Sequence, residues 1–334
     1  MAATQDVGGG RFALTAAVLT AVTAVAAAVA LKSGVVTATW SDVRNLFAED
    51  AGFAVRILRE VRLPRVLLAL LAGGALGVSG TILQKVLHND LAAPEIIGIS
   101  SGAGCAGMAL IFALPERIAL LGPAAFGGAL LAATLVYLAA WKRGVDPARL
   151  ILAGVAVSTL FATVTSALMM LNAGKLIGVF EFSLGGVAGK SFTELRESLP
   201  LFILAFFGAA LLARRLDILA LDDDSAASLG IHVELSRLAA LATAALAAAA
   251  AVSVAGLLGF VGLMAPHIAK SLGAVSAGKR LYLGAVVGAL LTVLGEWLGR
   301  VAAAPRELPA GVFLSAAGAV FFLILLLRHR RGDA

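Results

Sequence analysis

Apolar runs of about 20 residues recur along nearly the whole chain, and short polar breaks separate them. A transmembrane α-helix needs about 20 consecutive apolar residues to cross the hydrocarbon core of a bilayer. With 60% hydrophobic and 14% charged residues in a chain of 334, this repetition excludes a soluble domain built around one core. The sequence therefore predicts an all-α polytopic membrane protein embedded in the lipid bilayer.

The positions of the polar breaks predict about ten transmembrane helices in a single domain. We expect the spans at residues 12–31, 63–86, 95–113, 119–141, 149–171, 199–213, 237–258, 260–272, 281–299 and 308–327. The first run is longer than the core of a secretory signal, which has about 7–15 residues, so we interpret it as a span. The domain then covers residues 11–328, between an N-terminal tail, 1–10, and a C-terminal tail, 329–334.

The short eighth span follows from the pattern of glycines and from loop charge. Three glycines and Pro266 between Gly256 and His267 predict a broken segment, which membranes tolerate only where protein or water satisfies the backbone. Counting this segment as a span places the basic loops 142–149, 214–215 and 270–280 and the basic tail on one face. By the positive-inside rule that face is cytoplasmic, with both termini on it.

One polar stretch, Asp217 to Gly230, interrupts the apolar pattern on this face. Its three consecutive aspartates, Asp222 to Asp224, can accept hydrogen bonds from free N–H groups where a helix begins. Gly230 can end the helix in a left-handed conformation. A short capped helix outside the bilayer is predicted here, either as part of a solvated loop or as a surface that presses against a partner.

The opposite face is unusually rich in arginine, against the usual bias toward the cytoplasm. Arg62, Arg65 and Arg300 are among these residues. A docked acidic partner would explain the excess, and so would arginine side chains that extend along the helix ends to the interface. Glu296 is the only acidic residue well inside a predicted span, and its spacing predicts an i,i+4 pair with Arg300.

Several sequence patterns could suggest nucleotide binding, metal binding or catalysis, but each has a simpler explanation. Gly102 to Gly107 matches a dinucleotide-binding pattern, but it lies in an apolar span and indicates close helix packing. Gly189-Lys190-Ser191 resembles the end of a phosphate-binding loop, but its first glycine is out of register. The four histidines are far apart and the single cysteine lies in an apolar run, so no metal site is expected. The small, scattered positive charge argues against nucleic acid. The spans offer no set of catalytic side chains, so we expect no enzymatic activity.

Seven short segments together resemble the FecCD family, the membrane subunits of ABC importers for iron–siderophores, haem and cobalamin. They are Arg62-Leu-Pro-Arg65, Gly80-Thr-Ile-Leu-Gln84, Asn89-Asp-Leu-Ala-Ala-Pro94, Gly98-Ile-Ser-Ser-Gly102, Leu152-Ala-Gly-Val-Ala156, Gly259 to Ala269, and Glu307-Leu-Pro-Ala-Gly-Val312. The resemblance covers residues 55–328 in the family's order. The chain departs from the family pattern at Asp90, where proline is usual, and this predicts a looser turn.

The resemblance implies the type II ABC importer permease fold, a second permease subunit that is identical or paralogous, a cytoplasmic dimer of ABC ATPases, and a binding protein outside. ATP and Mg would then bind to the ATPases, with no cofactor in this chain. The resemblance assigns the docking of the binding protein to Arg62, Arg65 and Arg300, and the inner gate to Asn89 and Leu91. It assigns contact with the ATPase to a coupling helix at Asp222, Asp223, Asp224, Ser225, Ala226, Ala227, Ser228, Leu229 and Gly230.

Import of an iron chelate follows as the expected function. The Ala-Pro-Glu-Ile-Ile-Gly form at 93–98 is closer to the siderophore permeases of the family than to those for cobalamin, which makes a ferric siderophore the preferred substrate. Haem and cobalamin remain alternatives within the family. A secondary transporter driven by an ion gradient is the alternative from another class, and it would need more ionisable residues inside the spans than Glu296.

Overall fold

The computed structural model describes residues 9–48, 52–140, 147–172 and 182–330, and within these ranges it contains helices and no β-strand. The helices are α1 (Gly9–Lys32), α2 (Trp40–Arg44), α3 (Phe53–Ile57), η1 (Leu58–Arg62), α4 (Leu63–Val86), α5 (Ile99–Ala113), η2 (Pro115–Leu120), α6 (Leu121–Ala140), α7 (Pro147–Leu171), α9 (Phe192–Ile218), α10 (Asp223–Ser228), α11 (Val233–Ala255), α12 (Val261–Ser271), α13 (Ala277–Val301) and α14 (Ala310–Arg330).

These helices account for the ten predicted spans. Seven helices in the described residues are long and apolar enough to cross a membrane. The apolar helix α5, the segment Ala310–Leu325 of α14 and the 11-residue α12 are shorter and complete the set. The prediction of an all-helical polytopic protein is confirmed.

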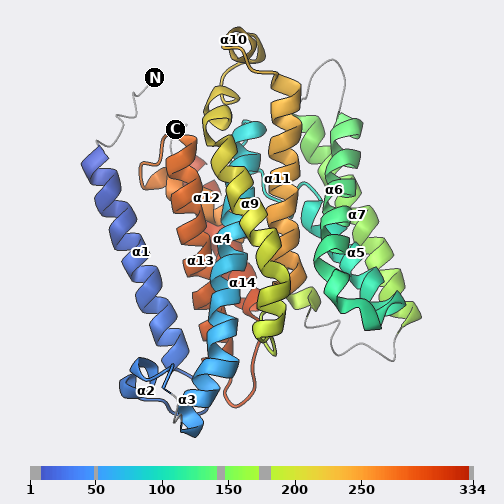
Figure 1. Cartoon of the computed structure of the whole chain (residues 1–334). Helices are drawn as coiled ribbons and strands as arrows, with labels where there is room; N and C mark the ends of the chain where they lie inside the picture. The colour runs from blue at the N-terminus through green and yellow to red at the C-terminus, as the bar shows by residue number, and fades with distance from the viewer. Residues whose placement is uncertain (1–8, 49–51, 141–146, 173–181, 331–334) are drawn as a thin grey trace.

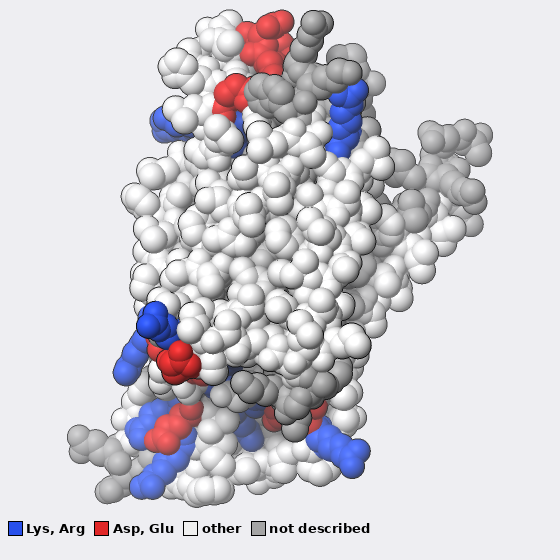
Figure 2. All heavy atoms as spheres, turned by 90° about the vertical axis from the view of Figure 1, so that its right-hand side faces the viewer, with Lys and Arg blue, Asp and Glu red and all other residues white. Residues whose placement is uncertain are grey.

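The long helices run side by side, and the two ends of the bundle differ (Figure 1). The first turn of α1, the last turn of α14 and the helix α10 lie at one end, here called the α10 end, whereas α2 and α3 lie at the other, the α2 end (Figure 1). Figure 2 shows charged side chains gathered toward these two ends, with a broad uncharged band between them on the face in view. Such a band is suited to the hydrocarbon core of a bilayer.

Helix α4 forms the centre of the bundle, because glycines let its neighbours approach closely. Gly73 and Gly77 face Gly288 and Gly284 of α13, and a Cβ atom on Gly77 would collide with the carbonyl of Gly284. Gly80 faces the carbonyl of Gly262 in α12 in the same way. Close contact through small residues is a main source of helix association in membranes.

The segment from Phe182 to Gly186, the break after α11 and the start of α14 meet inside the bundle. Leu257 donates its N–H to the carbonyl of Phe182 at 3.0 Å, and Gly186 donates to Ala255 at 2.7 Å. Gly311, at the start of α14, donates to Gly185 at 2.9 Å. The backbone freed by the break between α11 and α12 is thus satisfied by protein, as the glycine pattern predicted.

Several helices begin or end at other residues than the spans predicted for them, and three of these differences have a clear cause or consequence. The third span begins at Ile99, not 95, because residues 88–98 form a turn that leads into α5. The sixth span is the 27-residue α9, not 199–213, because Ser191 and Glu194 form a capping box that starts the helix at Phe192. Helix α14 continues to Arg330, into the predicted tail. Residues 1–8, 331–334 and most of the basic loop at 142–149 lie outside the described residues.

Candidate functional site

Helix α10 is the short capped helix that the aspartates predicted. The side chain of Asp222 accepts a hydrogen bond from the N–H of Ser225 at 3.0 Å, and Gly230 has φ +81° beyond the last turn. The bond from Ser225 lowers the pKa of the Asp222 carboxyl below its ordinary value. The cap is therefore charged, and accepts its bond, at neutral pH.

The other aspartates do not cap the helix. Asp223 pairs with Arg237 of α11 at 2.8 Å. Arg237 is buried and also lies 3.8 Å from Glu234, to which Tyr137 of α6 donates a hydrogen bond. This chain of contacts fastens α10 to two long helices, and a buried arginine paired in this way is costly to disrupt.

The tip of α10 presents an apolar side chain to its surroundings. Leu229 is 59% exposed, and Ala227 and Ser228 beside it are also exposed, whereas Ala226 faces inward. In the last turn of α9, which leads into α10, Asp217 accepts hydrogen bonds from the N–H of Ala277 at 2.7 Å and from Lys85 at 3.3 Å. The end of α9 is therefore bonded to the end of α4 and the start of α13.

The residues assigned to the gate lie in the turn between α4 and α5, also at the α10 end. Asn89 accepts the N–H of Leu91 on its side-chain oxygen at 2.8 Å, which closes a compact Asx-turn. Leu91 is 39% exposed. Asp90, expected to loosen this turn, instead forms an ion pair with Lys270 of α12.

Arg62, Arg65 and Arg300 come together at the α2 end, and all three are buried. Arg62 donates to the carbonyls of Leu31 and Lys32 at 3.1 and 2.7 Å, which are among the last four carbonyls of α1 and lack partners within that helix. Arg300 donates to the carbonyl of Ala30, another of these four. The arginine excess at this end thus has a structural role that sequence reasoning missed: two of the three close the end of α1.

Two glutamates complete this buried cluster. Glu296 accepts from Arg300 at 3.1 Å, which confirms the predicted i,i+4 pair, and lies 4.0 Å from Arg65. Glu307, in the turn before α14, pairs with Arg65, and this lowers the pKa of the Glu307 carboxyl. Each of the three guanidinium groups has partners inside the chain. Their role in docking a binding protein stays a prediction.

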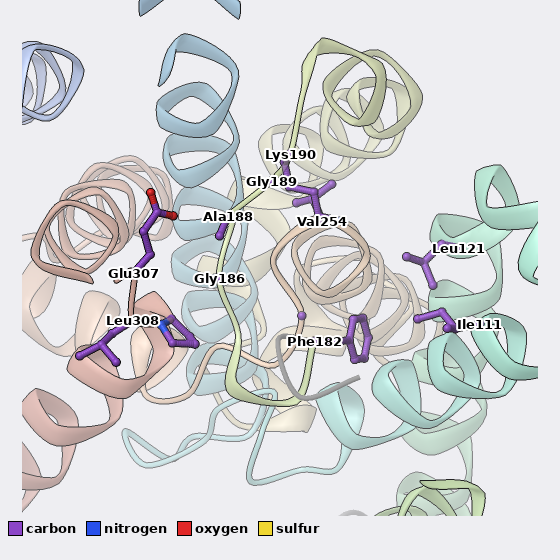
Figure 3. A pocket seen from close by; sticks show the side chains of 12 residues that line it. Ile111, Leu121, Phe182, Gly186, Ala188, Gly189, Lys190, Val254, Glu307 and Leu308 are labelled. Atoms are coloured by element: carbon purple, nitrogen blue, oxygen red, sulfur yellow. The ribbon is translucent and has the colours of Figure 1, made fainter. Parts of the chain in front are cut away.

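A cavity of ≈ 360 Å³ opens beside this cluster, at the α2 end. Glu307 and Leu308 lie on one side of it, Phe182 and Ile111 on the other, and the segment from Gly186 to Lys190 runs along it (Figure 3). Most of the lining is apolar, with Lys190 and Glu307 as its charged side chains.

The two nucleotide-like patterns have structural roles. Gly102 in α5 lies against Gly128 in α6, so the first pattern, from Gly102 to Gly107, includes a glycine that lets two helices pack closely. Ser191, at the end of the second pattern, caps α9. Among the described residues no group of three or more His, Cys, Asp or Glu is placed to hold a metal ion.

Comparison with known proteins decides the family. A family model described as the FecCD transport family matches residues 20–328, which is more than half of the chain. The chain belongs to the FecCD transport family. The achromobactin transport system permease protein CbrC of Dickeya dadantii (strain 3937) is 38% identical over 297 residues, which cover 87% of this chain and 84% of that protein. The ferric enterobactin transport system permease protein FepG of Escherichia coli (strain K12) is 33% identical and covers 96% of this chain and 98% of its own.

Two solved structures have a similar fold. A metal-chelate type ABC transporter in an inward-facing conformation has a TM-score of 0.82 at 26% identity, covering 94% of this chain and 99% of that one. PsaBC from Streptococcus pneumoniae in complex with Fab has a TM-score of 0.62 at 18% identity, a likeness of fold alone. The predicted type II ABC importer permease fold is confirmed.

Within this FecCD chain, the structure keeps the predicted site residues in two places. The gate and coupling residues share the α10 end, and the three arginines share the α2 end. Sequence reasoning missed the partners that hold them, namely Arg237, Lys270 and Glu307. Arg237 is 14 residues from its partner Asp223, and Lys270 is 180 residues from its partner Asp90. No local sequence pattern signals pairs at these separations.

Proposed function

We propose that this chain is the permease subunit of a binding-protein-dependent ABC importer that moves an iron chelate, with ferric siderophore as the preferred class, across the inner membrane. The observation that carries the proposal is the FecCD match over residues 20–328. The relatives named for achromobactin and ferric enterobactin, and the Fe(3+)-citrate import system permease protein YfmE of Bacillus subtilis (strain 168), support the substrate class.

The energy for transport comes from partner ATPases, which bind ATP and Mg, and enters through α10. A capped helix with an exposed leucine at its tip suits a groove on such a partner, because burial of a leucine side chain contributes about 1.5–3 kcal/mol. On this proposal the α10 end and both termini are cytoplasmic, and α10 acts on the end of α9, where Asp217 is bonded to Ala277 of α13 and Lys85 of α4. The chain itself catalyses no reaction.

The binding protein docks at the α2 end, which faces outward. Arg44, Arg56 and Arg306 are exposed there and are the first positive charges that an acidic partner meets. Glu307 has a side chain 39% exposed, and a glutamate of the partner takes its place on the buried Arg65 as docking is completed. Arg62 and Arg300 then act by holding the end of α1 in position beneath the docked protein.

A second permease subunit, identical or paralogous, packs against the apolar sides of α7 and α14. Only 17% of the most apolar stretch of α7 is buried within this chain, and Leu152 and Leu160 are among its exposed residues. Val320 and Leu323 are exposed in the same way on α14. The two subunits enclose the pathway, and Asn89 and Leu91 of each close it at the cytoplasmic end.

Uptake by reconstituted vesicles tests this function. Vesicles that hold the permease with its ATPases and binding protein are given a radioactive ferric siderophore, with ATP inside or with a proton gradient alone. We expect uptake only with ATP. Uptake that persists without the ATPases when a proton gradient is present would establish a secondary transporter and overturn the proposal.

A further inference from the structure

The turn between α4 and α5, residues His88 to Gly98 and here called the gate loop, is attached to the half-length helix α12 rather than standing free. Its first attachment lies at the start of α12. Glu95 accepts the N–H of Phe260 on its Oε1 atom at 2.8 Å, across 165 residues of sequence. Pro94 lies directly against Gly262, where a Cβ atom would collide with the proline ring.

Phe260 is an unusual residue for this position. It has φ +65°, in the left-handed region that non-glycine residues rarely adopt and that costs of order 1–3 kcal/mol. The surroundings fix this conformation: Glu95 holds its N–H, and its ring lies against Gly318 of α14, where no side chain would fit. Since Phe260 joins the break after α11 to α12, the bond from its N–H to Glu95 fixes the gate loop to the start of α12.

The second attachment lies at the other end of α12. Lys270, in its last turn, pairs with Asp90 of the gate loop. The side chains of both residues are about half exposed, and such a pair alone contributes about 0–1 kcal/mol. The ion pair matters because of where it lies. Helix α12 has 11 residues and is about 16 Å long, and the gate loop is bonded to both ends of this helix.

We propose that the gate loop and α12 move as one rigid body, with Glu95 as the positioning residue that joins them. This inference rests on the proposed transport function. It assigns a role to Glu95, Asp90 and Lys270 that neither the coupling helix nor Asn89 and Leu91 supply. On the proposed function, motion of α10 displaces the end of α9, where Asp217 is bonded to the N–H of Ala277 at the start of α13. Because α12 directly precedes α13 in the chain, the displacement reaches α12, and the gate loop attached to α12 moves with it.

Cross-linking tests this rigid body directly. Asp90→Cys and Lys270→Cys are combined with Cys105→Ala and joined by a reducible bis-methanethiosulfonate linker, with mass spectrometry to confirm the linkage. We expect ATP-driven uptake in the linked transporter to stay within about twofold of that in the same protein after reduction. Uptake that stops on linkage and returns on reduction would show that the two segments separate, and would overturn the inference.

Substitution of Glu95 gives a second readout. Glu95→Gln retains an oxygen that accepts the Phe260 N–H, whereas Glu95→Ala does not, and Glu116→Ala in η2 is an exposed control at the other end. We expect Glu95→Ala to lower uptake per ATP hydrolysed by about tenfold, with Glu95→Gln restoring most of it. Equal loss in both Glu95 variants, or none in Glu95→Ala, would remove the positioning role.

These outcomes are distinct from failure of the proposed function. If the unmodified transporter shows no ATP-driven uptake, the function itself is wrong. If it transports and only the linked form or both Glu95 variants fail, the function stands and the rigid body does not.

Discussion

Glu296→Gln removes one negative charge from the buried cluster at the α2 end with almost no change of volume. In the native protein Glu296 faces Arg300 at 3.1 Å and Arg65 at 4.0 Å, and the side chains of all three residues are at most 7% exposed. After the substitution, Glu307 is the one carboxylate left in this cluster for the guanidinium groups of Arg62, Arg65 and Arg300.

The expected loss of stability follows from this burial. Removing one partner of a buried ion pair costs about 3–5 kcal/mol, because the remaining charge stays buried without compensation. The glutamine oxygen can still accept from Arg300, and Arg300 keeps the carbonyl of Ala30, so the lower end applies. We expect the free energy of unfolding to fall by about 3 kcal/mol.

Denaturant titration of the detergent-solubilised chain in mixed micelles, followed by tryptophan fluorescence, measures this loss. Glu307→Gln is the matched control and should cost about 1 kcal/mol or less, since its side chain is 39% exposed and solvent screens the pair. The double variant Glu296→Leu/Arg300→Met should recover at least part of the loss, because it removes both charges together. A Glu296→Gln variant within about 0.5 kcal/mol of the native protein would refute the reasoning.

Two further predictions concern packing and the cap of α10. Gly77→Ala should sharply reduce the yield of folded protein on size-exclusion chromatography, because the added Cβ atom would collide with the carbonyl of Gly284. Gly127→Ala is the control and should leave the yield unchanged, because there is open space around Gly127. Equal yields of the two variants would contradict the packing. Asp222→Ala should speed hydrogen exchange of the Ser225 amide at neutral pH. The hydrogen bond from Ser225 lowers the pKa of the Asp222 carboxyl, so in the native protein the cap stays charged above pH 3.8, the ordinary value. Protection of the Ser225 amide should therefore persist from neutral pH to below pH 3.8 and be lost as the pH falls through the lowered pKa. Protection that is lost near neutral pH would exclude this cap.

Features set by neighbouring residues were predictable from the sequence. Leu63 to Val86 forms α4 as expected, because its apolar length and Pro64 in the first turn define it locally. The cap at Asp222 and the pair between Glu296 and Arg300 also follow from spacings of three and four residues. The start of α9 carried such a signal too, the serine and glutamate of a capping box, but the polar residues of its first turns suggested a loop.

Features set by distant contacts were not predictable. The arginines at the α2 end suggested an external acidic partner, whereas the structure gives them carbonyls of α1 and two glutamates as partners. Arg62 can donate to the carbonyls at the end of α1 only because that helix end, about 30 residues earlier in the chain, lies beside it in the fold. Composition contains no information on this contact. The same holds for Glu95, whose partner is Phe260.

The central claim is that energy from ATP enters this permease through α10. The most direct test is Leu229→Glu in the reconstituted transporter, with uptake and ATP hydrolysis measured on the same vesicles. Leu229 is 59% exposed and makes no contribution to the membrane core, so the fold should persist. We predict that ATP hydrolysis continues while siderophore uptake falls by about tenfold or more. Uptake that remains at the native level would contradict the claim.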